Sequence, residues 1–198
     1  DCPEFFGQAL TSIIDQMLPP AEITLVADGP LTDKLNQVIS CYMNNNPSLF
    51  NFIQLENNVG IGRAMNTGLE ACKYEYVARM DADDIALPDR FIKQFTYLNE
   101  HPEIDIIGGI IEEFRDIPGD MKRYRKVAVK HKDIVEFTKS RCPFNHMTVE
   151  YKKSKVLSAG SYWPRRTFED YHLWYRMIRA GYQCHNLSEV LVYARIGN

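Results

Sequence analysis

Apolar residues recur along this chain in two patterns that alternate from the N-terminus onward. Between residues 3 and 17 they are spaced three or four positions apart, as on one face of a helix, whereas residues 22–27 (EITLVA) form the short continuous run of a buried strand. The same alternation then predicts helices at 32–42, 60–72 and 88–99 and strands at 51–55, 74–80 and 104–114. Strands that alternate with helices favour an α/β fold with a mostly parallel central sheet flanked by helices.

The second half of the chain is less regular. The remaining elements that its pattern predicts are helices at 131–140 and 168–180 and strands at 147–152 and 190–194. No linker, repeat or low-complexity tract divides the sequence, so we expect one domain over 1–198 with two halves, 1–115 and 116–198. Domains of this class usually begin with a strand, whereas this chain begins with a helix, so we expect it to lack the first strand of its sheet.

The composition is that of an ordinary globular protein, with 45% hydrophobic and 25% charged residues among 198. The sequence has no run of about 18 apolar residues, which a membrane-spanning helix would need. The five cysteines are widely spaced and form no CxxC pair, so no zinc site is indicated and reduced thiols are the simplest interpretation. We therefore expect a cytoplasmic protein, and the sequence predicts no particular oligomeric state.

Charge is distributed unevenly, although the formal net charge is only −3. Residues 121–155, the basic segment, hold eleven lysines and arginines against three acids, and the remainder holds twelve against twenty-three. This segment predicts contact with an anionic acceptor or with a phospholipid surface, at the inner face of the membrane. The alternative is a solvated face balanced by acidic neighbours. Nucleic acid is not an expected partner, because the whole chain is acidic and the segment lacks a stacking motif.

Three carboxylates follow the strand predicted at 74–80, in the sequence Asp81-Ala-Asp83-Asp84. Crowded carboxylates repel one another unless a cation lies between them, and their oxygens suit Mg²⁺ or Mn²⁺. Such a cation also binds phosphate oxygens, so the pattern indicates a diphosphate substrate at the carboxyl end of the sheet. We assign Asp83 to the metal, Asp81 to ribose or a metal-bound water, and Asp84 to capping the following helix. The alternative is a polar strand end that enters a helix cap.

Two further turns follow predicted strands. Asp28 ends the first of these strands, where its carboxylate could accept a hydrogen bond from the N–H of a base such as uracil, although Asp-Gly-Pro is also a favourable turn. Residues 57–68 form a Gly-rich helix start, but Met65 replaces the third glycine of the dinucleotide-binding motif, so that motif fails. A helix start favours anions, and Arg63 could reach a base or phosphate; the alternative is a tight turn with Arg63 in solvent.

Glu169 and Asp170 open the helix predicted at 168–180, where the helix dipole stabilises negative charge. Capping alone would explain both carboxylates. Asp170 at a rigid helix end would also serve as a general base that takes a proton from an alcohol within hydrogen-bond reach. Glu169, His146 and Trp163 are weaker candidates for the acceptor side of such a site.

Four stretches in this order resemble the family 2 glycosyltransferases: VADGP at 26–30, NNVGIGRAMNTGL at 57–69, VARMDADDIALPDRF at 77–91 and FEDYHLWYRMIRAGY at 168–182. The resemblance covers nearly the whole chain, and the combination is specific although no single motif is. It implies an inverting enzyme of the GT-A fold, a Rossmann-like α/β fold, that uses a nucleotide-diphosphate sugar. Bacterial members that build polysaccharides or lipid-linked glycans are the most similar.

For individual residues, the resemblance implies that Asp28 contacts the base, Arg63 lies near the nucleotide, Asp81 and Asp83 form the metal and ribose (DXD) motif, and Asp170 is the catalytic base. We expect 1–115 to be the nucleotide-sugar half and 116–198 the acceptor half. The chain departs from the family in the first strand that we expect it to lack, which in the family carries part of the nucleotide pocket.

We therefore expect a metal-dependent transferase that moves a sugar from a UDP-linked donor to an acceptor hydroxyl of a glycan or lipid-linked glycan, with inversion. Three alternatives remain. A nucleotidyltransferase would release pyrophosphate, and a glycoside hydrolase, which also uses two carboxylates, would cleave without nucleotide or metal. A non-catalytic glycan-binding module would bind sugar and turn over no donor.

Overall fold

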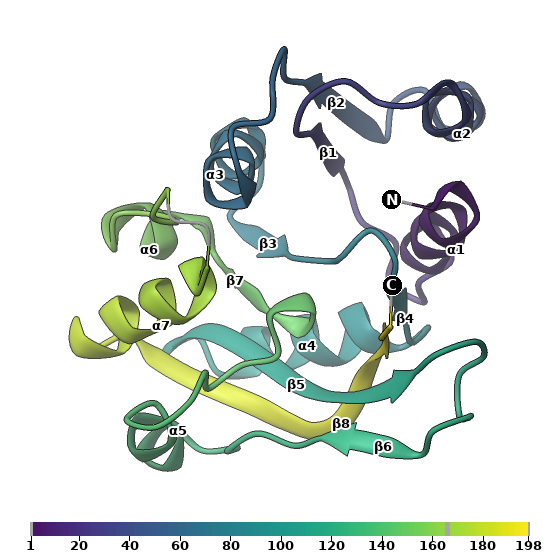
Figure 1. The fold of residues 1–198 in the computed structure, drawn as a ribbon. Helices are drawn as coiled ribbons and strands as arrows, with labels where there is room; N and C mark the ends of the chain where they lie inside the picture. The colour runs from purple at the N-terminus through teal and green to yellow at the C-terminus, as the bar shows by residue number, and fades with distance from the viewer. Residues whose placement is uncertain (1, 165–166, 198) are drawn as a thin grey trace.

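The computed structural model describes residues 2–164 and 167–197 of the chain (Figure 1). The helices are α1 (Pro3–Ile14), α2 (Asp33–Asn45), α3 (Ile61–Ala71), α4 (Arg90–Glu100), α5 (His131–Phe137), the 3₁₀ helix η1 (His146–Thr148), α6 (Lys153–Ser158) and α7 (Glu169–Arg179). The strands are β1 (Ile23–Ala27), β2 (Phe50–Gln54), β3 (Tyr76–Ala78), β4 (Ile85–Ala86), β5 (Ile104–Phe114), β6 (Arg123–Arg125), β7 (Glu150–Lys152) and β8 (Gln183–Arg195).

Within the described ranges the strands pair into two sheets. β1 and β2 form a parallel pair, and the larger sheet has the order β3-β7-β5-β8-β4, with β6 paired to β5. β5 and β8 are parallel, but β7 runs antiparallel to both β3 and β5, and the pairs β4–β8 and β5–β6 are also antiparallel. The α/β class is therefore confirmed, whereas the sheet is mixed and not mostly parallel.

The mixed pairing has a local cause. The regular alternation of strands and helices, from which parallel pairing was predicted, ends at β5. Beyond it, β6 folds back on β5, and β7 enters between β3 and β5 in the opposite direction. Antiparallel neighbours need no helical crossover, so the sequence pattern carries no sign of them.

Several short elements and one long strand differ from the prediction. β8 begins at Gln183, well before the predicted strand at 190–194, and aligns with β5 along its length. Polar residues interrupt the apolar run in its first part; among them Asn186 is fully buried and donates to the carbonyls of Ala128 and Pro143. β4, β6 and α6 span at most six residues each, too few for a periodic pattern to indicate.

Gly181 ends α7 as its sequence predicts. It has φ of 86°, its N–H donates to the Ile178 carbonyl at 3.0 Å, and the Tyr182 N–H donates to the Met177 carbonyl at 3.1 Å. These two bonds form a Schellman motif, which requires a residue that tolerates positive φ. The helix whose first turn carries Asp170 therefore has a fixed C-terminal end.

The largest cluster of buried side chains surrounds Trp174 of α7, which is fully buried. The rings of Phe144, His146, Tyr151 and Tyr162 lie around it, with centroids between 5.7 and 6.2 Å away. Edge-on aromatic packing of this kind is directional as well as apolar. It holds α7 in one orientation against η1, β7 and the segment that contains Tyr162.

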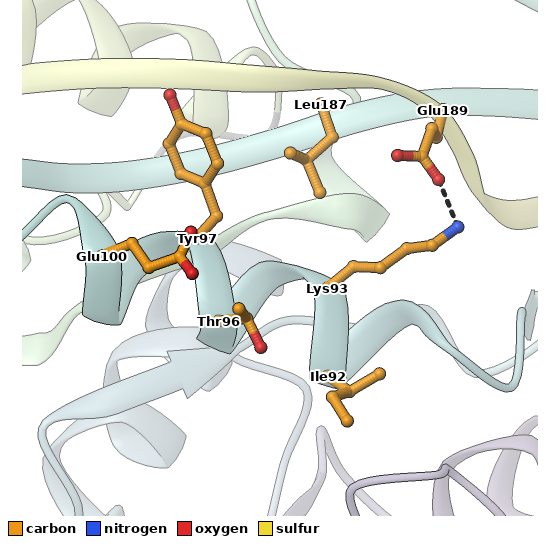
Figure 2. A pocket seen from close by; sticks show the side chains of 7 residues that line it. All are labelled: Ile92, Lys93, Thr96, Tyr97, Glu100, Leu187 and Glu189. Atoms are coloured by element: carbon orange, nitrogen blue, oxygen red, sulfur yellow. Dashed lines mark ion pairs between the residues drawn. The ribbon is translucent and has the colours of Figure 1, made fainter.

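An open hollow lies between α4 and the middle of β8 (Figure 2). Lys93 reaches across it to the carboxylate of Glu189, and Tyr97 and Leu187 form much of its apolar lining. None of the residues that the sequence predicted for function lines it. The candidate carboxylates therefore lie outside this hollow.

The basic segment 121–155 does not form one face. Arg123 and Arg125 of β6 both pair with Glu113 of β5, whereas Lys153 of α6 donates to backbone carbonyls at the end of α3. β6 and α6 are at opposite sides of the molecule in Figure 1. Part of the positive charge thus has internal partners. Across 2–164 and 167–197, no helix is both long and apolar enough to cross a membrane.

Candidate active site

Two carboxylates of the turn between β3 and β4, Asp81 and Asp84, lie in different environments. Asp81 pairs through Oδ1 with Nη2 of Arg79 at 2.5 Å. Asp84 is only 2% exposed, and its Oδ1 accepts from the backbone N–H of Arg195 at 2.7 Å. Asp84 therefore ties the turn to β8. The prediction that it caps the following helix is wrong, because β4 intervenes and the N-cap of α4 is Asp89.

The carboxylates of this turn repel one another when they are ionised. Burial, and then the charge of Asp81, raise the pKa of Asp83. Burial and the same charge raise the pKa of Asp84 to about 7. Carboxylates in this situation are stabilised by a cation. Asp81 and Asp83 are the acids that the sequence assigned to the donor, and this electrostatic environment is compatible with that assignment.

The turn also fits a divalent cation that shares its ligands with a substrate. No group of three or more His, Cys, Asp or Glu side chains within 2–164 and 167–197 is placed to hold a metal by itself. Mg²⁺ and similar ions are often held by one or two carboxylates together with substrate phosphates. Asp83, with its unfavourable ionisation, suits that kind of site.

Asp28 fixes the turn that precedes α3. Its Oδ1 accepts from the N–H of Val59 at 2.7 Å and its Oδ2 from the N–H of Gly60 at 3.0 Å. A carboxylate has about four lone-pair sites, so these bonds leave room for a further donor. Arg63 is exposed in the first turn of the helix that Asp28 holds. The predicted contacts of Asp28 and Arg63 with a nucleotide stay predictions.

The start of α3 packs against the segment around Trp163. Asn66 donates to the Tyr162 carbonyl at 2.8 Å and accepts from the Tyr162 N–H at 2.9 Å. A Cβ on Gly62 would lie 2.4 Å from the carbonyl oxygen of Trp163, so only glycine permits this approach. The Trp163 ring in turn stacks on His172 of α7, with centroids 5.4 Å apart. Trp163 therefore bridges the helices that carry Arg63 and Asp170.

Asp170 lies in the first turn of α7 and is partly exposed. Its Oδ1 accepts from the N–H of Tyr171 at 2.7 Å, and its Oδ2 lies 3.5 Å from Sγ of Cys142. Burial, and then the charge of Asp170, raise the pKa of the Cys142 thiol to about 12, so the thiol stays protonated as a donor. Glu169, the preceding residue, is 9% exposed.

His146 lies beside the same cluster, with Nε2 3.3 Å from the hydroxyl of Tyr162. Burial and the nearby charge of Arg79 lower its pKa well below the usual range, so its ring is neutral at pH 7. Burial raises the pKa of the Tyr162 hydroxyl well above its usual range, so Tyr162 is also uncharged at pH 7.

The sequence predicted Asp28, Arg63, Asp81, Asp83, Asp170, Glu169, His146 and Trp163 for the site. The structure adds Arg79, Cys142 and Tyr162 as neighbours of Asp81, Asp170 and His146, and the sequence did not single these three out. Arg79 had a signal, because it is a charged residue inside a predicted buried strand. Cys142 and Tyr162 had none, since each reaches the site only through contacts distant in sequence: with Asp170 in one case and with Asn66 in the other.

Comparison with known proteins agrees with these motifs. The family model described as Glycosyl transferase family 2 matches residues 1–168. The chain is 41% identical to the amylovoran biosynthesis glycosyltransferase AmsE of Erwinia amylovora, covering 99% of this chain and 72% of that protein. It is 34% identical to the UDP-Gal:alpha-D-GlcNAc-diphosphoundecaprenol beta-1,3-galactosyltransferase of Escherichia coli, covering 97% of this chain and 69% of that protein.

A solved structure shares the fold. The mannosyltransferase PcManGT from Pyrobaculum calidifontis, in complex with GDP-Man and Mn²⁺, superposes with a TM-score of 0.75 at 15% identity over 100% of this chain. The chain spans 55% of that protein, a little over half of its length. The mixed sheet and its helices thus form the expected GT-A fold. The match of the family model to residues 1–168 shows that the chain belongs to glycosyl transferase family 2.

Proposed function

We propose that this protein transfers a sugar from a nucleotide-diphosphate donor, UDP-linked, to an acceptor hydroxyl with inversion, in the synthesis of a cell-surface polysaccharide or lipid-linked glycan. The observation that carries the proposal is a series of contacts that runs from Asp28 to the start of α3, from Asn66 of α3 to Tyr162, and from Trp163 to His172 of α7. These contacts connect the elements that carry the predicted nucleotide residues and the predicted base. The names of the relatives, which include amylovoran biosynthesis and transfer to a diphosphoundecaprenol sugar, support this class of donor and acceptor.

On the donor side, each predicted residue has a distinct role. Asp28 would accept from the base, and Arg63 in the exposed first turn of α3 would contact the nucleotide. Asp81 would accept from a ribose hydroxyl while Arg79 holds its other oxygen. Asp83 would hold a divalent cation, Mn²⁺ or Mg²⁺, which when bound supplies positive charge to the diphosphate leaving group.

On the acceptor side, Asp170 takes the proton of the attacking hydroxyl. The oxygen attacks the anomeric carbon from the face opposite the diphosphate, so the bond to the diphosphate breaks and the configuration inverts. Trp163 would form a wall for the acceptor sugar. Neutral His146, fixed by Tyr162, would orient a hydroxyl, and Glu169 would act from its buried position beside Asp170.

We further propose that residues 1–198 form one catalytic domain, with 1–115 on the nucleotide-sugar side and 116–198 on the acceptor side. The dense contacts between α3 and the segment around Trp163 cross these halves, which supports one unit. The exposed part of the basic segment would meet an anionic, lipid-linked acceptor at the cytoplasmic face of the membrane.

The test is calorimetric titration of the protein with UDP-, GDP- and TDP-sugars, with and without Mn²⁺, followed by transfer to acceptor. We expect Mn²⁺-dependent binding of one nucleotide class and a product whose anomeric configuration, read by NMR, is opposite to that of the donor. Asp170→Asn should keep donor binding and lose transfer. Asp133→Asn on the exposed face of α5 is the matched control and should transfer normally.

Each result tests a different part of the proposal: the base, the mechanism or the activity. Normal transfer by Asp170→Asn would remove the assignment of the base. Retention of the donor configuration would exclude the single-displacement mechanism. Absence of nucleotide binding, with or without Mn²⁺, would contradict the proposed activity and favour a glycan-binding role.

A further inference from the structure

Arg79 forms an ion pair with the acidic turn through the bond of its Nη2 to Asp81, whereas the guanidinium of Arg195 donates to the backbone carbonyl of Asp83. Its backbone is fixed on both sides, because its N–H donates to the Val149 carbonyl at 2.9 Å and its carbonyl accepts from Nη2 of Arg90 at 2.8 Å. The side chain is 13% exposed. Arg79 therefore cannot easily move away from Asp81.

The guanidinium of Arg79 is not held by a full set of hydrogen bonds. Its Nη1 is buried and has no hydrogen-bond partner among the described residues. A buried unpaired donor costs free energy, so packing alone does not explain a charged residue at this position. The charge of Arg79 also interacts electrostatically with other groups. These are the rings of Tyr151, Tyr162 and His146, the guanidinium of Arg90 and the acids Asp83 and Asp84. Asp81 is its ion-pair partner.

We infer that Arg79 is an internal counter-cation of Asp81, which reserves Asp81 for ribose and makes divalent-cation binding conditional on the nucleotide diphosphate. Arg79 offsets part of the charge of Asp81, so a free cation gains less from Asp81 than from an unpaired carboxylate. Asp83 alone offers one carboxylate, too few ligands to hold Mn²⁺ firmly. A diphosphate brings its own oxygens and completes the coordination without Asp81. This inference rests on the proposed function, because it assumes a nucleotide-diphosphate donor.

The arrangement would also order the binding steps. A cation would enter with the donor and leave with the nucleotide product, because the protein alone holds it weakly. The Arg79–Asp81 pair would stay intact throughout, with Oδ2 of Asp81 available to a ribose hydroxyl. Arg79 would then be a positioning residue, which acts on the donor through Asp81 and not by contact with the reacting atoms.

The test measures Mn²⁺ binding to the protein without nucleotide, from the electron paramagnetic resonance signal of free Mn²⁺. We expect weak binding by the wild type and tightening by about tenfold or more in Arg79→Met, because removal of the guanidinium exposes the charge of Asp81 to the cation. The double variant R79M/D81N should lose this gain. Lys34→Met on the exposed face of α2 removes one positive charge elsewhere and should bind Mn²⁺ as the wild type does.

Arg79→Gln is the second variant in case Arg79→Met does not fold, with folding checked by circular dichroism, and it should also gain Mn²⁺ affinity. Asp81→Asn in the otherwise native chain should leave nucleotide-free Mn²⁺ binding unchanged. Unchanged Mn²⁺ affinity in a folded Arg79 variant, or loss of affinity in Asp81→Asn, would overturn the inference. Failure of the wild type to bind any nucleotide diphosphate with Mn²⁺ would instead overturn the proposed function, so the two failures are distinguishable.

Discussion

The thiol sulfur of Cys142 lies 3.5 Å from Oδ2 of Asp170, at the residue proposed as the catalytic base. The same sulfur is 3.3 Å from the carbonyl oxygen of Phe144, so its single S–H proton can be donated to either acceptor. Since burial raises the pKa of this thiol to about 12, it remains a donor and not a thiolate at neutral pH. Cys142 would therefore orient Asp170 without reacting itself.

Cys142→Ala should lower kcat about two- to tenfold, the range expected for one lost hydrogen bond, and leave donor KM unchanged. Cys142→Ser restores a donor and should recover kcat. Steady-state kinetics with donor and acceptor varied in turn check this, and an unchanged kcat in Cys142→Ala would exclude the positioning role.

Gly62→Ala should lower the free energy of unfolding by about 1–3 kcal/mol, the usual cost of overpacking. The added Cβ would lie 2.4 Å from a backbone oxygen of Trp163, so the segment that bridges α3 and α7 has to move. Gly7→Ala is the matched control, since its Cβ in α1 would meet nothing closer than 3.7 Å. That variant should gain about 0.5–1 kcal/mol from helix propensity. Urea unfolding followed by circular dichroism measures both; equal effects would contradict the tight approach.

The buried carboxyl of Glu150 makes stability depend on pH. Burial raises its pKa to about 7, and the charge of Arg90 offsets only part of this effect. The folded state therefore binds a proton that the unfolded state has released, so stability is lost as pH rises from about 4.5 to 7, by an amount on the order of 3 kcal/mol. Glu150→Gln should flatten this slope, and the exposed Glu136→Gln should not. Free energies of unfolding measured at pH 5 and pH 8 test this prediction. An unchanged dependence on pH in Glu150→Gln would contradict the role given to the Glu150 carboxyl.

The sequence predicted the α/β class, because periodic apolar segments long enough for a helix or a buried strand dominate its first half. It did not predict the mixed pairing, since the direction of β7 depends on contacts with β3 and β5 and not on its own three residues. The candidate carboxylates could be selected from the sequence because they follow predicted strands or open a predicted helix. Cys142 meets Asp170 only because folding brings distant segments together, so no local pattern marks it. Arg79 is two residues from Asp81 and is marked only by its charge within a predicted buried strand.

Asp83→Asn should abolish the Mn²⁺-dependent part of donor binding while leaving the fold intact, because the amide keeps the volume of the side chain and loses the charge that a hard cation requires. The pKa of Asp83 is raised by burial and by Asp81, so removing its charge also relieves repulsion within the turn. The variant should therefore be at least as stable as the wild type. Titration calorimetry with the preferred nucleotide, with and without Mn²⁺, measures the binding, and Asp133→Asn is the control for loss of one carboxylate. If Mn²⁺-dependent binding persisted in Asp83→Asn, the metal ligand would have to be assigned to another residue. A lower free energy of unfolding in this variant would show that the Asp83 carboxylate stabilises the fold.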